Sequence, residues 1–225
     1  MDLNQEISCL QRIIEEIFTR YQQYSQKYET LTTEKINLKS KCIDHFLEKE
    51  NEILNFTIFK EIEFFKNLID QEVTSFLIEE EISILNTDRR IKNDKSIYNK
   101  LLKYRMGPQK GKIPIQKCLN DLLGYRFIFK NNITFDDLFD WLKGIVAEDK
   151  ELNSKVRVLD SSKDNYKAIH LYFKGISNYT FPCELQVWLN DDDKTNKQSH
   201  RLYKQDYLYW EEKETNIVGG NERGE

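Results

Sequence analysis

The sequence predicts an α+β fold: a mixed β-sheet flanked by helices, with a helical extension at the N-terminus. Residues 1–88 contain no proline or glycine and place apolar residues three and four positions apart, which is the helical spacing. Beyond residue 88, four short runs rich in β-branched and aromatic residues alternate with helical segments. The order helix, strand, helix, three strands, helix is typical of a sheet covered by helices. We therefore divide the chain into a helical region, 1–88, and a second domain, 89–225.

The N-terminal region is predicted to form three or four helices, with breaks near residues 29–33 and 51–57. The apolar residues that follow the helical template are Leu10, Ile13, Ile14 and Phe18, and then Ile58, Phe59, Ile62 and Phe65. An extension of this kind is most often a packing or oligomerisation surface. We expect this region to pack against the rest of the chain, and the formation of a homo-oligomer is left as an open possibility.

The second region is expected to open with a helix from about residue 89, on which the cations share one face. That face carries Lys92, Ser96, Lys100 and Lys103, and the apolar side carries Ile97, Leu101 and Tyr104. A mobile loop, MGPQKGKIP, and a short helix follow. The expected strands are LGYRFIFK, VRVLDSS, AIHLYFK and CELQVWL. The expected helices are FDDLFDWLKGIVAE, capped near Thr134, and TNKQSHRLYKQDYLYWEE at the end.

Charge is distributed unevenly along the chain. The formal net charge of −4 argues against a general nucleic-acid coat, because such surfaces need a basic excess. Residues 1–90 sum to about −7, whereas residues 91–130 sum to about +8. One strongly positive zone therefore lies within an acidic protein, and it fits a ligand that carries several negative charges.

Composition indicates a globular protein of the cytoplasm. Hydrophobic residues make up 39% of the sequence and charged residues 32%, which is typical of a folded chain. The start of the sequence is acidic and periodic, unlike a signal peptide, and no stretch approaches the roughly 18 apolar residues of a membrane span. We expect a cytoplasmic protein with no membrane partner.

The cysteines indicate neither a disulfide framework nor a zinc site. Cys9, Cys42, Cys118 and Cys183 lie far apart and form no C-x-x-C pair, and we find no histidine at metal-ligand spacing. They are interpreted as buried free thiols in a reducing compartment.

Two acidic residues lie beside or inside expected strands. Asp121 stands just before LGYRFIFK, and Glu184 lies inside CELQVWL. A glutamate buried without a partner in an apolar strand costs several kcal/mol, so it needs a cation or a metal ion. From the residues alone, an ion pair with Arg126, a solvent-facing position and a functional role all stay open.

Four short motifs follow one another between residues 90 and 186. They are Arg90-x-Lys92-x-x-x-Ser96-x-x-x-Lys100, Asp121-x-x-Gly124-x-Arg126, Asn165-Tyr166-x-x-x-His170 and Glu184-x-Gln186. Together they resemble the synthetase domain of the RelA/SpoT family of alarmone synthetases, whose pattern is R-x-K-x-x-x-S-x-x-x-K, D-x-x-G-x-R, G-Y-x-S-x-H and E-x-Q. The resemblance says nothing about residues 1–88.

The resemblance implies a nucleotidyltransferase-like synthetase fold and a role for each motif. The reaction would move the β,γ-diphosphate of ATP to the 3′-hydroxyl of GDP or GTP, or, in a toxic branch of the family, to the 3′ end of tRNA. The implied ATP-binding residues are Arg90, Lys92, Ser96 and Lys100. The implied catalytic residues are Asp121, Glu184 and Arg126, and Asp121 and Glu184 would also hold Mg²⁺. The implied acceptor-binding residues are Tyr166, as a stacking platform, His170, Gln186, Lys163, His200 and Lys204.

The sequence departs from the family pattern on the acceptor side. Trp188 stands where an arginine is usual after E-x-Q, Asn165 replaces the glycine before Tyr166, and Ala168 replaces a serine. The motifs implied to bind ATP are intact. The donor chemistry is therefore better supported than the identity of the acceptor.

Three functions stay open at this point. The first is an ATP-dependent pyrophosphokinase that makes guanosine penta- or tetraphosphate, and the second is a toxin that modifies the 3′ end of tRNA and is paired with an antitoxin protein. The third is a catalytically silent nucleotide-binding module. The sequence contains no His-Asp dipeptide, which the family's hydrolase domains carry, so we expect synthesis without hydrolysis. We also expect no regulatory C-terminal extension, as in the small stand-alone synthetases.

Overall fold

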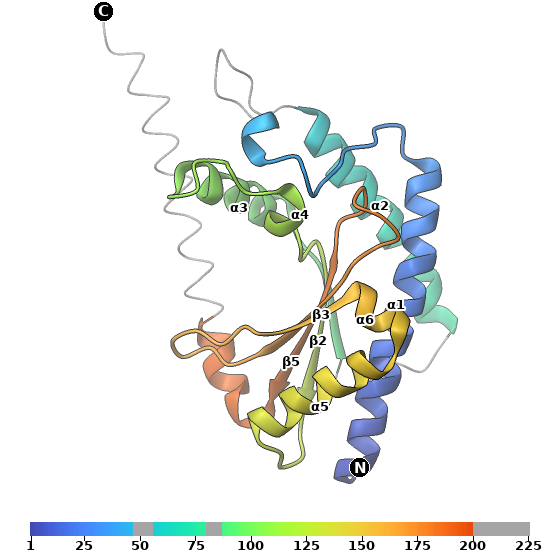
Figure 1. Cartoon of the computed structure of the whole chain (residues 1–225), viewed down its shortest axis with the longest axis vertical. Coiled ribbons are helices and arrows are strands. Elements are labelled where there is room, and N and C mark those ends of the chain that lie inside the picture. Colours follow the sequence, from blue (N-terminus) through green and yellow to red (C-terminus); the bar gives the residue numbers. More distant parts are fainter. Residues whose placement is uncertain (47–55, 80–86, 200–225) are drawn as a thin grey trace, which may run out of the picture.

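A mixed five-stranded β-sheet lies at the centre of the computed structural model, which describes residues 1–46, 56–79 and 87–199 (Figure 1). The strands are β1 (Thr87–Ile91), β2 (Leu123–Phe129), β3 (Val156–Asp160), β4 (Ile169–Phe173) and β5 (Cys183–Leu189). Their order across the sheet is β1-β2-β5-β4-β3. β2 and β5 pair in parallel, and the other neighbouring pairs are antiparallel. The structure confirms the predicted α+β class with a mixed sheet.

Helices precede, connect and follow the strands. They are α1 (Leu3–Leu31), α2 (Phe56–Glu79), α3 (Asp94–Met106), α4 (Ile115–Cys118), α5 (Phe135–Glu148) and α6 (Lys150–Lys155), with 3-10 turns η1 (Ile43–Phe46) and η3 (Asn190–Asp192). The end of α1 confirms the break predicted near residues 29–33, and α5 confirms the helix predicted after Thr134. The Thr134 hydroxyl accepts the N–H of Asp137 at 3.1 Å, as a capping residue does.

Some sequence predictions fall partly or wholly outside the described residues. The last predicted helix is helical over the described residues 195–199, and its remainder, with His200 and Lys204, lies outside them. The break predicted near residues 51–57 lies mostly outside them as well. Helix α6 was not predicted.

The helix predicted from about residue 89 begins later, so this prediction is wrong. Thr87–Ile91 form the edge strand β1, which pairs antiparallel with β2, and α3 begins at Asp94. The Asn93 side chain accepts a backbone N–H of the first turn at 2.8 Å, and this cap fixes the start of the helix. Lys92 therefore lies in the connection between β1 and α3 instead of on the helix face.

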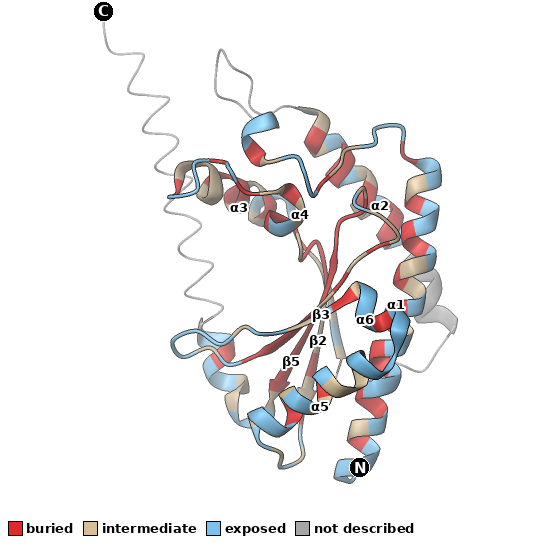
Figure 2. Ribbon diagram, in the orientation of Figure 1, coloured by how far each residue is buried: buried red, intermediate tan, exposed pale blue. Residues whose placement is uncertain are grey.

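Alternation along the strands gives the sheet one apolar and one polar face, because successive side chains point to opposite sides. The buried residues of the apolar face are Leu123, Phe127, Phe129, Leu171, Phe173, Leu185 and Val187. They share one hydrophobic core with Leu138 and Leu142 of α5 and with the apolar side of α1. Figure 2 shows this burial along the strands and on one side of α1.

Helix α1 is also tied to the sheet by hydrogen bonds. The Glu6 carboxylate accepts the N–H groups of Lys130 and Asn131, each at 2.8 Å, beyond the end of β2. Further along α1, the Ser25 hydroxyl donates to the Thr180 hydroxyl at 3.1 Å. In the described residues the N-terminal helices are thus packed onto the sheet through one core. The boundary between residues 88 and 89 stays a prediction.

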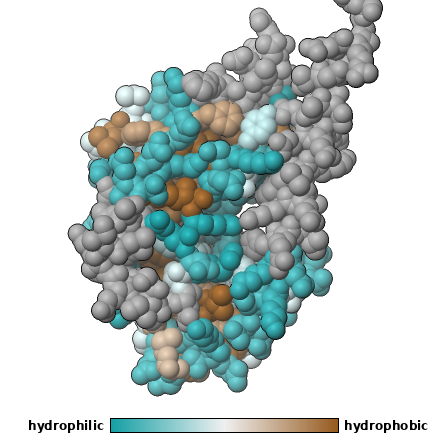
Figure 3. Space-filling view, turned by 180° about the vertical axis from the view of Figure 1, so that it is seen from behind, coloured by the Kyte–Doolittle hydropathy of each residue, from teal (hydrophilic) through white to brown (hydrophobic). Residues whose placement is uncertain are grey.

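The outer surface is mostly polar. Figure 3 shows a predominantly hydrophilic face with small, separate hydrophobic patches. The large hydrophobic side chains exposed on the described residues are Met1, Leu3, Leu31 and Leu159. Among the described helices, none combines the length and the apolar character that crossing a membrane requires.

We predict that Glu6→Ala lowers the free energy of unfolding by about 2–3 kcal/mol, because the backbone N–H groups of Lys130 and Asn131 lose their charged acceptor. The Glu6 side chain is fully buried, so its packing is lost as well. Urea denaturation measures the difference, with Glu15→Ala as the matched control on the exposed side of α1. Equal losses for the two variants would contradict a bracing role for Glu6.

Candidate active site

The register of the strands brings the predicted motif residues together on the polar face. One row across the sheet consists of Arg90, Gly124, Glu184 and Tyr172. The adjacent row consists of Asp88, Arg126, Gln186 and His170. Directly opposed residues in a sheet have Cβ atoms about 4.5–5.5 Å apart, so their side chains interact. Residues from all four motifs therefore contribute to two neighbouring rows.

Asp121 joins the first two motifs through a buried ion-pair cluster. It precedes β2 and is 8% exposed. The Nζ of Lys92 donates to Oδ2 at 2.5 Å, and the Nζ of Lys100 donates to Oδ1 at 3.0 Å. Lys100 also donates to the side-chain oxygen of Asn120 at 3.3 Å. The carboxylate therefore lies between two ammonium groups.

The electrostatics of this cluster favour the ionised carboxylate. Burial alone would raise the pKa of Asp121, but the charges of Lys100 and Lys92 outweigh it and hold the pKa well below its usual value. Burial lowers the pKa of Lys92, and the neighbouring charges of Lys100 and Arg90 add to this effect, whereas Asp121 opposes it. Three cations thus lie close enough to repel one another, with Asp121 as the nearest anion to two of them.

Glu184 is the second buried carboxylate, 3% exposed in the middle of the sheet. Its Oε1 lies 2.9 Å from Nδ1 of His170, and its Oε2 accepts from Nε2 of Gln186 at 2.7 Å. Burial would raise the pKa of Glu184, but His170 and Gln186 stabilise the charged form and lower it, while the charge of Asp121 acts in the opposite direction. Glu184 is therefore also ionised at neutral pH.

Arg126 occupies the polar face next to Glu184. Its Nη2 donates to Oε1 of Gln186 at 3.2 Å, and its guanidinium lies 3.7 Å from the centroid of the Trp188 ring. Gln186 thus stands between Arg126 and Glu184, in place of the direct ion pair that the sequence left open. Burial and the neighbouring charge of Arg90 lower the pKa of Arg126, so these two guanidinium groups are close in space.

Tyr166 reaches the same rows from the segment before β4. Its hydroxyl lies 2.9 Å from Nε2 of His170, and it accepts from Nε1 of Trp188 at 3.3 Å. Burial raises the pKa of Tyr166 to about 12, so the hydroxyl keeps its proton at neutral pH. Tyr172 lies on the other side of His170, with its hydroxyl 3.1 Å from Nδ1.

The structure thus brings together most of the residues that the motifs indicated. These are Arg90, Lys92, Lys100, Asp121, Arg126, Tyr166, His170, Glu184 and Gln186. Ser96 stands in the first turn of α3, and Lys163 is exposed and pairs with Tyr166 through backbone hydrogen bonds at 2.8 and 2.9 Å. The roles implied for these residues stay predictions.

The sequence analysis missed three residues of the candidate site. They are Asn120, Tyr172 and Trp188, the last through its contact with Arg126. Tyr172 and Trp188 each stand two positions from a predicted site residue in a strand, on the same face. The strand period of two could therefore have indicated them. Asn120 carries no comparable signal.

The two buried carboxylates fit a magnesium ion in their chemistry. Both are held in the ionised form, and Mg²⁺ prefers carboxylate oxygens together with water and phosphate. Each carboxylate oxygen of Asp121 and Glu184 has a nitrogen donor within hydrogen-bond distance, yet a carboxylate offers about four lone-pair sites, so acceptor capacity is left on each.

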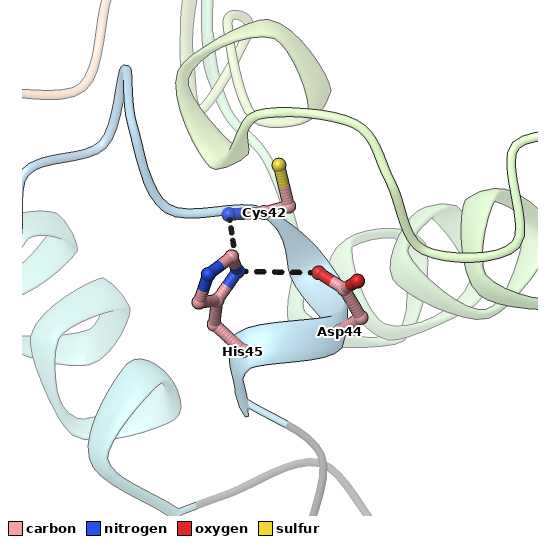
Figure 4. A group of neighbouring side chains, drawn as sticks. All are labelled: Cys42, Asp44 and His45. Atoms are coloured by element: carbon pink, nitrogen blue, oxygen red, sulfur yellow. Dashed lines mark hydrogen bonds and ion pairs between the residues drawn. The ribbon is translucent and has the colours of Figure 1, made fainter.

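A separate group of metal-ligating residues lies on η1, away from the sheet (Figure 4). His45 Nδ1 is 3.2 Å from Oδ1 of Asp44 and accepts the N–H of Cys42 at 3.2 Å. Ligand atoms of the three residues lie within 4.8 Å of one another. The statement that no histidine stands at ligand spacing was too broad, since Cys42 and His45 are three residues apart on one turn.

A cavity of about 580 Å³ lies at the far end of β2 and β5, between residues 130–134 and 189–191. Of the predicted site residues that the structure describes, none lines it. The candidate site is therefore defined by its charge cluster and hydrogen bonds, and not by this cavity.

Comparison with known proteins gives similarity at the level of structure only. No protein-family model matches the chain, and no curated protein matches its sequence. The small alarmone synthetase 1 from Bacillus subtilis bound to its product pppGpp is similar with 16% identity and a TM-score of 0.36, over 75% of this chain and 96% of that chain.

Two further structures are similar to the same degree. The small alarmone synthetase 2 from Bacillus subtilis has 19% identity and a TM-score of 0.35, over 69% of this chain and 94% of that chain. The small alarmone synthetase 1 from Bacillus subtilis bound to AMPCPP has 15% identity and a TM-score of 0.30, over 73% of this chain and 93% of that chain. At these scores the likeness lends no support to a particular activity, and the function proposed below rests on the chain's own residues.

We predict that Asp121→Asn lowers the free energy of unfolding at pH 7 by about 3 kcal/mol, because it leaves the ammonium groups of the buried Lys92 and the half-buried Lys100 without their anion. The folded pKa of Asp121 is depressed, so its contribution is complete above the unfolded pKa of about 3.9 and is lost as the pH falls below that value. The difference between the variant and the unmodified protein should therefore shrink in acid. Chemical denaturation from pH 7 to pH 3 measures it, with the exposed Asp140→Asn as control. A difference that grows in acid would contradict the ion-pair cluster.

Proposed function

We propose that the protein is an ATP-dependent pyrophosphokinase that transfers the β,γ-diphosphate of ATP to the 3′-hydroxyl of GDP or GTP. The observation that carries this proposal is the pair of buried, ionised carboxylates, Asp121 and Glu184, placed among the four cations Arg90, Lys92, Lys100 and Arg126. A cluster of this charge pattern matches a triphosphate and its transfer chemistry.

Arg90, Lys92 and Lys100 would supply the binding energy for the donor. The triphosphate of ATP carries about four negative charges, and fixed ammonium and guanidinium groups compensate them. Lys92 and Lys100 are bound to Asp121. Phosphate oxygens would compete for these ammonium groups, which frees acceptor capacity on Asp121. The Asp121 carboxylate thus holds the two lysines where the donor would bind.

Asp121 and Glu184 would hold Mg²⁺, which neutralises charge on the phosphates and on the leaving oxygen when bound. The other steps involve only the two substrates and the residues of the chain. The 3′-oxygen of the acceptor forms a bond to the β-phosphorus, and the bond between that phosphorus and the oxygen bridging to the α-phosphate breaks. AMP leaves with that oxygen, and the proton of the attacking hydroxyl passes to Glu184.

Glu184 is suited to orient the attacking hydroxyl. His170 and Gln186 fix both of its oxygens at 2.9 and 2.7 Å, so the carboxylate has one orientation. Its lowered pKa makes it a weak base before the donor binds. Proton uptake would therefore accompany, and not precede, formation of the bond to phosphorus, when the hydroxyl becomes acidic.

The 3′ end of tRNA is the second candidate acceptor, and it would make the protein a toxin paired with an antitoxin protein. The observation that favours it is Trp188, which stands where the family that the sequence resembles usually has an arginine. Its indole is fully buried. A phosphate contact of a free nucleotide is therefore absent at this position of the strand.

The deciding experiment follows labelled diphosphate from ATP. Purified protein with Mg²⁺ is incubated with GDP, GTP or bulk tRNA, and AMP release and labelled product are measured together. AMP released in proportion to a labelled guanosine nucleotide supports the first acceptor, and label on tRNA alone supports the second. If ATP binds but no mixture releases AMP, the protein is a catalytically silent nucleotide-binding module. That result would overturn the proposal.

We predict that Glu184→Gln lowers the rate of AMP release by about 10²–10⁴-fold, because the variant neither accepts the proton nor carries the charge that Mg²⁺ requires. The affinity for ATP should change far less, since the lysines remain. Initial rates and calorimetric ATP titration separate the two effects, with the exposed Glu15→Gln as control. A variant as active as the unmodified protein would remove Glu184 from the reaction.

A further inference from the structure

Trp188 is an unusual residue for its position in the sheet. It lies in β5 on the polar face, two residues after Gln186 and four after Glu184, yet its side chain is completely buried. A buried indole needs a partner for its N–H and a neighbour for its ring face. Both are present: the partner of the N–H is Tyr166, on the proposed acceptor side, and the neighbour of the ring face is Arg126, one of the proposed catalytic residues.

The first contact is a stacked cation. The guanidinium carbon of Arg126 lies 3.7 Å from the centroid of the Trp188 ring. Stacking on an aromatic face restricts the rotation of a long arginine side chain and offsets part of its desolvation. This matters here because Nε of Arg126 is buried and has no hydrogen-bond partner among the residues that the structure describes. The ring of Trp188 therefore holds the guanidinium at a fixed place beside Gln186.

The second contact is a hydrogen bond to Tyr166. Nε1 of Trp188 donates to the tyrosine hydroxyl at 3.3 Å, and the two rings meet edge to face with centroids 6.0 Å apart. Tyr166 comes from the segment before β4, and this contact ties that segment to the middle of the sheet.

These contacts close a circuit of side chains. The Tyr166 hydroxyl lies 2.9 Å from Nε2 of His170, whose Nδ1 lies 2.9 Å from Glu184. Glu184 accepts from Gln186 at 2.7 Å, and Gln186 accepts from Arg126 at 3.2 Å. Arg126 then stacks on Trp188, which returns to Tyr166.

The donors and acceptors in the circuit are mutually consistent. Glu184 accepts only, so Nδ1 of His170 donates to it, and the tautomer with its proton on Nδ1 leaves Nε2 able to accept from the Tyr166 hydroxyl. The oxygen of that hydroxyl is left to accept from Trp188, which can only donate. Each member therefore fixes the hydrogen-bonding role of the next.

We propose that Trp188 is a positioning residue, which holds Arg126 and Tyr166 in the orientation that binds the acceptor. This inference rests on the proposed pyrophosphokinase function. Trp188 itself has no exposed surface and acts through its two neighbours. Lys92 and Lys100, on the donor side, pair instead with Asp121. Loss of Trp188 should therefore weaken binding of the acceptor and leave binding of ATP nearly unchanged.

The test compares Trp188→Phe, which keeps a ring face but loses the N–H, with Trp188→Leu, which loses both. We expect Trp188→Leu to raise the KM for the acceptor by about tenfold, with the KM for ATP within twofold of the unmodified protein. The KM of Trp188→Phe for the acceptor should lie between those of the unmodified protein and Trp188→Leu. Trp141→Phe, a half-buried tryptophan on α5, is the matched control. Melting temperatures are recorded for each variant, and the ATP KM reports whether the donor side remains folded.

A double variant tests the hydrogen bond directly. Tyr166→Phe removes the hydroxyl that Trp188 donates to, so Trp188→Phe should add little to the acceptor KM in that background. Full additivity would overturn the hydrogen-bonded link, and equal effects of Trp188→Leu on the KM for ATP and for the acceptor would overturn positioning in favour of a general packing role.

Turnover of the unmodified protein separates the two hypotheses. If it releases AMP and Trp188→Leu leaves the acceptor KM unchanged, the inference fails and the proposed function stands. Should the Leu variant fail to fold, Trp188→Phe alone and in the Tyr166→Phe background decides the matter. If the unmodified protein releases no AMP with GDP, GTP or tRNA, the proposed function fails, and the inference that rests on it fails as well.

Discussion

The site depends on keeping one carboxylate ionised where little water reaches it. Removing an anion from water costs several kcal/mol, and an unpaired Asp121 would take up a proton to avoid that cost. Lys92 and Lys100 prevent this by donating to both of its oxygens. The same pairing allows two mutually repelling lysines to lie side by side near Arg90. Each charge in the cluster is therefore tolerated because of the others.

The sheet places this cluster beside the second carboxylate. Parallel pairing of β2 with β5 sets Gly124 directly opposite Glu184, and antiparallel pairing with β1 sets Arg90 on its other side. A Cβ built at Gly124 would lie 3.5 Å from the Arg90 side chain and 4.0 Å from Glu184. A methyl group would fit there, but a longer side chain would occupy the space between the guanidinium and the carboxylate. The glycine of the second motif thus keeps open the middle of the row.

Sequence reasoning succeeded where local pattern determines structure. β2 and β5 carry an apolar residue at every second position, a pattern that indicates strands, and Thr134 caps α5 through its own side chain. It failed at β1, because TDRRI is too charged to look like a strand, and its strand state comes from pairing with β2 more than 30 residues away. Lys92 was accordingly placed on a helix, although the motifs still grouped it with Asp121, which it contacts.

The partners of Glu184 illustrate what a single sequence leaves open. The residue types indicated that it needs a cation, and Arg126 was the nearest candidate. The register between β4 and β5 instead sets His170 opposite Gln186, and this offset lets the imidazole reach Glu184. Register is fixed by the packing of the whole apolar face, since a slip of one residue would expose every core side chain of the strand. The polar contacts of the site are therefore specified by hydrophobic residues on the opposite side of the sheet.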